Sequence, residues 1–183
     1  MPLGAWFVCW QGSLQHELLH GHPTRIKAIN SLLAYPCLWL WRPCPTYSES
    51  HLEHHNDDAL VVPGVDPESY YVSAEDWASA PSWRRFLLRA RNSLAGRFIL
   101  GPAMAYVELF QAETQRFRDG DRSHVIHWLV HIPVVAAVLY WVIGVCGIPF
   151  WVYVICFAYP GLSLTMLRSF AEHRPATEPS ARI

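Results

Sequence analysis

Charged side chains are scarce in this chain, and neither sign forms a long run. Asp, Glu, Lys and Arg make up 16% of the 183 residues, and the formal net charge is -1. Proteins that bind nucleic acid usually carry a basic patch or stripe, because contacts to phosphates dominate their affinity. The composition therefore argues against nucleic acid as a partner.

Two further patterns are missing. The five cysteines show no C-x-x-C spacing and mostly lie in apolar stretches, which indicates small buried side chains rather than zinc ligands or a disulfide framework. We also expect no secretory signal peptide, because the first ten residues carry no basic segment. Residues 2–10 are apolar but too short to span a bilayer, so we expect them to be the end of a hydrophobic helix.

Hydrophobic side chains, by contrast, are abundant at 52% of the residues. Residues 125–143 and 150–167 are almost wholly apolar, and the uncharged segment 144–149 between them contains two glycines and a proline. Each run is close to the roughly 20 residues that a membrane-spanning helix needs. We therefore predict a single domain over residues 1–183, with a hairpin of membrane helices at about residues 125–168.

Basic residues set the expected orientation in the membrane. By the positive-inside rule, arginine-bearing segments beside the hairpin face the cytoplasm, and the turn 144–149 faces outside. The basic residues in question flank the hairpin or the histidine-bearing segments: Arg116, Arg118, Arg122, Arg168, Arg174, Arg25, Lys27 and Arg42. The histidine clusters and His173 would then share the cytoplasmic side.

Two shorter segments suggest further helices. Residues 28–41 are apolar and interrupted by Pro36, which is typical of a re-entrant or shallow helix, or of a short segment packed inside the protein. Residues 84–98 alternate arginines with large apolar side chains. That pattern predicts an amphipathic interfacial helix on the membrane surface, with a soluble amphipathic helix as the alternative.

Two histidine clusters about thirty residues apart are the most informative feature. On a helix, His16 and His20 share a face, and His51, His54 and His55 project to one side. Histidine is the commonest metal ligand, and imidazole suits iron, zinc and copper. The spacing therefore predicts a metal site built from both clusters.

One alternative is a zinc protease, because residues 16–20 match H-E-x-x-H with Glu17 as general base. A single tetrahedral zinc cannot use all five histidines, whereas two metal ions can. His22 follows Gly21 and is expected to face solvent or to support a ligand. Three more histidines, at i, i+3 and i+7, either hydrogen-bond neighbours at the start of a membrane helix or supply a ligand: His124, His127 and His131.

The segments HELLHGHP, HLEHHNDD, DPESYY and LRSFAEHR, in this order, resemble the membrane fatty acid desaturase and hydroxylase family in its bacterial form. The resemblance runs from about His16 to Arg174. It implies an all-α integral membrane helical bundle with cytosolic histidine-box helices, placed in the bacterial inner membrane. It also implies two non-haem iron ions held by six histidines: His16, His20, His51, His54, His55 and His173.

The resemblance further implies an oxygen-dependent oxidoreductase of lipid metabolism that desaturates a fatty acyl chain, with molecular oxygen as co-substrate. Its partners would be the acyl lipid, membrane lipids and an electron donor such as ferredoxin. Hydroxylation or ketolation of a lipid or carotenoid on the same scaffold is the alternative. Carboxylates beside the boxes are candidates to orient the imidazoles: Glu17, Glu53, Asp57 and Glu172.

The chain also departs from the family, whose third histidine box, H-x-x-H-H, follows the EHR segment. No histidine follows His173. The sequence therefore suggests a fragment, a truncated gene product, a chain whose missing ligands come from another chain, or an inactive remnant.

Overall fold

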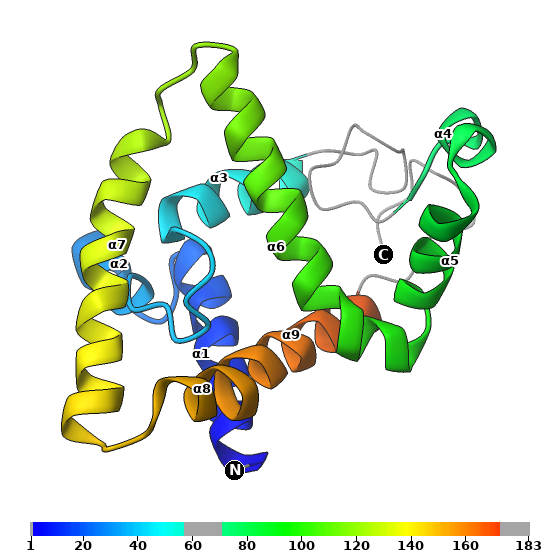
Figure 1. Ribbon diagram of the computed structural model, residues 1–183. Coiled ribbons are helices and arrows are strands. Elements are labelled where there is room, and N and C mark those ends of the chain that lie inside the picture. Colours follow the sequence, from blue (N-terminus) through cyan, green and yellow to red (C-terminus); the bar gives the residue numbers. More distant parts are fainter. Residues whose placement is uncertain (1, 57–70, 173–183) are drawn as a thin grey trace.

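The computed structural model describes residues 2–56 and 71–172, and within these ranges every regular element is a helix. Figure 1 shows the arrangement, with the N-terminal helix α1 (Pro2–Leu19) at the centre of the fold. This confirms the predicted all-α class. The short helix α2 (Lys27–Ala34) and the second histidine-bearing helix α3 (Cys44–Asn56) follow along the chain.

The apolar segment 28–41 forms α2 and then an irregular stretch that packs inside the protein. Cys37 and Trp39 in this stretch are almost fully buried, with 1% and 6% of their surfaces exposed. Two tyrosines hold it from other helices, since the hydroxyl of Tyr106 donates to the carbonyl of Trp39 and that of Tyr153 donates to the carbonyl of Leu38. Of the interpretations open from the sequence, a short segment packed within the protein describes it best.

The predicted helix over residues 84–98 is two helices. The structure has α4 (Ala74–Ser79), α5 (Ser82–Arg91) and then the long helix α6 (Leu94–Arg118). The break comes at Ser93, whose side chain accepts a hydrogen bond from the backbone N–H of Gly96 at 3.0 Å and so caps the start of α6. The sequence-based prediction of one continuous helix was wrong because it overlooked this N-cap.

Two long apolar helices follow. The first comprises α7 (Val125–Leu139) and a π-helical continuation, η1 (Tyr140–Val145). The second comprises α8 (Phe150–Tyr153), the π-helical segment η2 (Val154–Ala158) and α9 (Tyr159–Glu172). Val125–Val145 and Phe150–Ser169 are long and apolar enough to cross a membrane. Large apolar side chains on the first helix, such as Leu129 and Trp141, are about 60% exposed, as lipid-facing residues would be.

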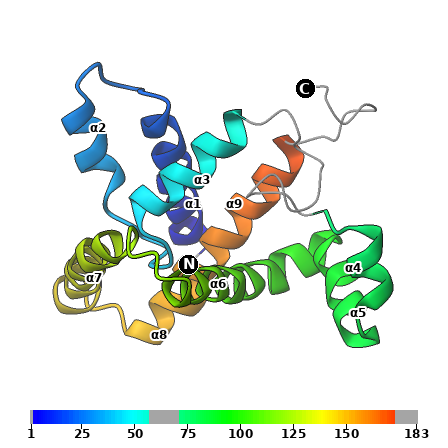
Figure 2. The same cartoon turned by 90° about the horizontal axis from the view of Figure 1, so that it is seen from above.

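The two apolar helices diverge after the turn instead of running alongside one another. Figure 2, seen from above, shows α9 extending away from α7, and α9 packs on α1 and α6. A glycine lets α9 approach α1 closely, because a Cβ added at Gly161 of α9 would lie 2.5 Å from Val8 Cγ1 of α1. The packed core lies at this crossing, formed by five buried residues: Val8, Cys37, Trp39, Leu162 and Met166.

Candidate metal centre

The end of α1 places the first pair of histidines. Gly21 adopts a left-handed conformation, with φ at 83°. The N–H of Gly21 donates to the carbonyl of Leu18, and the N–H of His22 donates to that of Glu17. This is the Schellman pattern of hydrogen bonds that terminates a helix. It ends the helix at Leu19, so that His16 lies in the last turn and His20 directly follows it, with the two ring centroids 4.8 Å apart.

A buried amide holds this end of α1 in position. Gln15, only 2% exposed, donates from Nε2 to the carbonyl of Ala34 at 2.6 Å. Its Oε1 accepts the indole N–H of Trp39 at 2.9 Å. Because every polar atom in a buried amide must find a partner, these bonds fix the rotation of α1 about its axis. Gln15 therefore positions the neighbouring His16.

Helix α3 places the second group of histidines. Pro45 lies in its first turn, where proline is favourable because the first helical N–H groups have no partner in the helix. His51 and His55 follow one turn apart, so both rings project from the same side. Their ring centroids are 4.5 Å apart. The helix points this side towards the end of α1.

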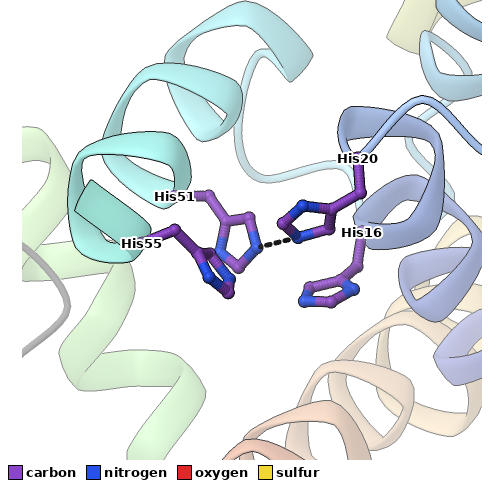
Figure 3. A group of neighbouring side chains, drawn as sticks. All are labelled: His16, His20, His51 and His55. Carbon is purple, nitrogen blue, oxygen red and sulfur yellow. Dashed lines mark hydrogen bonds between the residues drawn. The ribbon is translucent and has the colours of Figure 1, made fainter. Parts of the chain in front are cut away.

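Four histidines from the two helices converge on one point, which we call the four-histidine cluster: His16, His20, His51 and His55. Figure 3 shows their rings facing one another across the gap between the helices. One ring nitrogen from each lies within 4.8 Å of the others. The Nε2 atoms of His20 and His51 are 3.3 Å apart. Neighbouring ligands on a tetrahedral ion with bonds of about 2.1 Å stand about 3.4 Å apart, so this donor set fits a transition-metal ion.

At two of the four histidines, His16 and His55, the surroundings favour the neutral imidazole, which is the form that binds metal. Burial, assisted by the neighbouring imidazoles, lowers the pKa of His55 to about 4. Burial also lowers the pKa of His16, although its hydrogen bond to Glu17 acts in the opposite direction. Both rings therefore carry a free lone pair at neutral pH.

Of the four carboxylates predicted to orient the imidazoles, Glu17 does so. Its Oε1 lies 3.1 Å from His16 Nδ1, and its Oε2 lies 3.4 Å from Nδ1 of His22, an exposed side chain. A carboxylate on the second ring nitrogen fixes the tautomer and makes the first nitrogen a better ligand. Glu53 is exposed and makes no hydrogen bond to a histidine within the described ranges. Asp57 and the side chain of Glu172 lie outside them.

The remaining predicted ligands are placed differently. The ring of His54 is buried, with its centroid 5.5 Å from that of His55 and 6.2 Å from that of His51. It lies beside the four-histidine cluster rather than in it, and its role as a ligand remains a prediction. His173 lies outside the described residues.

Sequence reasoning missed a second group of ligand-type side chains, formed by Glu49, His124 and His127. The i, i+3 spacing of the two histidines was visible, but nothing in the sequence pairs them with Glu49. His131, which had been grouped with them, is buried farther along α7.

Comparison with known proteins gives one match. The family model described as fatty acid desaturase matches residues 1–182, nearly the whole chain. No curated protein and no solved structure matches the chain.

Proposed function

Because the chain belongs to the fatty acid desaturase family, we propose that it is a membrane oxidoreductase that desaturates a fatty acyl chain with molecular oxygen. The observation that carries this proposal is the four-histidine cluster, in which two separate helices bring imidazoles to one point. The family and the two apolar helices are consistent with a membrane protein.

Two irons are the metals that suit the proposed reaction, with His16, His20, His51 and His55 as ligands. His54 and His173 would complete the set that the family resemblance suggests. Iron bound there would supply the oxidising power, drawn from oxygen and external electrons, that an unactivated C–H bond requires. An all-imidazole donor set would keep the irons electron-poor compared with carboxylate or thiolate ligands.

The chain's own side chains prepare this site before any metal binds. Glu17 accepts a hydrogen bond from His16 and so directs the other ring nitrogen to the cluster. Gln15 fixes α1 against the segment that follows α2. Preorganisation of this kind limits the loss of side-chain freedom that metal binding would otherwise cost.

The proposed substrate is an acyl lipid that reaches the cluster from the bilayer. The apolar outer surface of Val125–Val145 would face lipid, and the arginine-rich segment ahead of it would meet head groups on the cytoplasmic side. A small redox protein such as ferredoxin would deliver electrons from that side. The proposed location is a bacterial inner membrane, with the histidine boxes facing the cytoplasm.

The test is expression of the chain in a bacterial host that supplies reduced ferredoxin, followed by analysis of total fatty acids. New double bonds are expected with the native chain and not with His20→Ala or His51→Ala. Hydroxylated or keto products in their place would replace desaturation with hydroxylation or ketolation. An iron-loaded native chain that leaves the fatty acids unchanged would overturn the proposal.

A further inference from the structure

A second group of ligand-type side chains lies between α3 and α7. Glu49, His124 and His127 each offer one ligand atom, and the three atoms lie within 4.8 Å of one another. At about 100° per residue, Glu49 stands roughly 160° around α3 from His51. The group is therefore separate from the four-histidine cluster and occupies the opposite face of the same helix.

The first histidine of this group is held between two carboxylates. His124 Nδ1 lies 2.8 Å from Glu113 Oε1, and His124 Nε2 lies 2.8 Å from Glu49 Oε2. The other oxygen of Glu113 accepts the indole N–H of Trp128 at 2.7 Å. Glu113 is thus fixed by two donors and orients His124 so that Nε2 faces Glu49, as carboxylates do behind metal-binding histidines.

The second histidine is arranged in the same way. His127 Nδ1 lies 3.3 Å from the hydroxyl oxygen of Thr46, which can accept its N–H. Its Nε2 lies 3.8 Å from Glu49 Oε1. Both imidazoles therefore use Nδ1 for an orienting hydrogen bond and present Nε2 to one carboxylate.

The surroundings of His124 call for a positive charge. A neutral imidazole has one N–H, yet both ring nitrogens lie at hydrogen-bond distance from carboxylate oxygens. Either a second proton or a cation must therefore lie between Nε2 and Glu49. A proton would neutralise only one of the two carboxylate charges, whereas a divalent cation between neutral imidazoles would balance both. His124 is 9% exposed and Glu113 is 15% exposed, so this balance matters more than it would on an open surface.

We propose that Glu49, His124 and His127 form a second metal site, for a divalent transition-metal ion of the zinc class. Two imidazole nitrogens and one carboxylate are a common zinc donor set, with water in the fourth position. The distances of 2.8 and 3.8 Å lie on either side of the roughly 3.4 Å expected between ligands of a tetrahedral ion. Because Glu49 is 55% exposed, its side chain can make the small shift required.

The ion would join α3 to α7. Since α3 also carries His51 and His55, the ion would set the rotation of that helix and so the direction of its other histidines. Glu113 and Thr46 are positioning residues in this arrangement. The second site rests on its own contacts and stands whether or not the proposed desaturase function is correct.

The experiment uses the purified full chain in detergent, with Zn²⁺ alone as the probe. After loading and dialysis, elemental analysis gives the zinc retained by each variant. Glu49→Gln is expected to retain about one zinc fewer per chain than the native protein. The control Glu75→Gln removes an exposed carboxylate on α4 and should retain the native amount. Native circular dichroism of Glu49→Gln shows that the variant folds.

A double variant separates the two sites. His20→Ala alters only the four-histidine cluster, so adding Glu49→Gln to it should remove the same further zinc. His127→Gln should reproduce the effect of Glu49→Gln. Zinc contents that are equal with and without Glu49→Gln, in both backgrounds, would overturn the proposal. A zinc-treated protein whose NMR spectrum shows two N–H protons on His124 would do so as well, since the second proton would then occupy the metal position.

Discussion

The Nε2 atoms of His20 and His51 lie 3.3 Å apart although 31 positions separate the two residues in the sequence. His20 comes from the end of α1 and His51 from the middle of α3, so neither helix contains a site by itself. The separation is the one that adjacent ligands of a single ion require. Contacts between α1 and α3 therefore create the site that the sequence divides between two boxes.

Removal of either histidine is expected to abolish tight iron binding. Loss of an orienting group typically weakens a metal site about 10–100-fold, so loss of a direct ligand through His20→Ala or His51→Ala should exceed 100-fold. Competition with a coloured iron chelator measures the affinity. His22→Ala, which removes an exposed imidazole next to the same box, serves as the control. An unchanged affinity in both box variants would refute the assignment of the cluster as an iron site.

Glu17 and Glu53 should behave differently, although each stands beside a histidine box. Glu17→Gln removes the carboxylate that orients His16 and should weaken iron binding about 10–100-fold, with little loss of stability because the side chain is half exposed. Glu53→Gln is the matched comparison and should bind iron normally. Equal affinities in the two variants would show that the contact between Glu17 and His16 has no effect on the metal.

Gln15→Ala should destabilise the fold. It leaves the indole N–H of Trp39 and the carbonyl of Ala34 buried without partners, at a cost of about 1–3 kcal/mol for each. The midpoint of thermal unfolding in detergent reports the loss. Gln115→Ala, on an exposed turn of α6, should change stability by less than about 0.5 kcal/mol. A melting temperature for Gln15→Ala equal to that of Gln115→Ala would contradict the role given to the buried amide.

Gly161→Ala tests the crossing of α1 and α9. The added methyl group would meet Val8 Cγ1 at 2.5 Å and the carbonyl of Ala5 at 3.1 Å, so one helix must move. Overpacking of this kind costs about 1–3 kcal/mol. The control is Gly144→Ala, where the nearest atom lies 3.5 Å away. Thermal unfolding measures both, and equal stability would show that the two helices separate without strain.

Membrane topology can be tested with a cysteine that the chain already has. Cys146 is exposed in the turn after η1, whereas Cys9, Cys37 and Cys44 are buried. By the positive-inside rule, a maleimide that cannot cross membranes should label Cys146 on intact cells, because the turn between the two apolar helices then faces outside.

The matching probe is Asp119→Cys in a Cys146→Ser background, at the exposed segment before α7. It should react only after the cells are permeabilised. Labelling of Asp119→Cys on intact cells, together with no labelling of Cys146 in the native chain, would show that the topology is the reverse of the expected one.

Local patterns gave the parts of the fold that depend on neighbouring residues. The apolar runs predicted both long helices, and helical spacing predicted the pairs His16 with His20 and His51 with His55. The resemblance of the histidine motifs predicted the fatty acid desaturase family, and the family model confirms it. The break at Ser93 was missed, because the amphipathic pattern continues across it while one side-chain cap decides the helix boundary.

Contacts between helices that are distant in the sequence could not be predicted from local sequence patterns. The sequence does not show that Gly161 admits α9 against α1, so the divergence of the two apolar helices was not foreseen. Nor does it pair Glu49 with His124, which lies 75 positions away. His54 has the spacing of a ligand, yet its ring lies beside the cluster, with its centroid 5.5 Å from that of His55. For Gly161 and for Glu49 the deciding contact joins helices that are distant in the chain.

Because α3 carries ligand-type side chains on two opposite faces, the rotation of α3 about its axis affects metal binding at both. One face presents His51 and His55 to α1, and the opposite face presents Glu49 to α7. A turn of one residue about the helix axis, about 100°, would remove both sets from their partners together. Whatever fixes this rotation on one face must favour binding on the other, and by linkage the effect is equal in both directions.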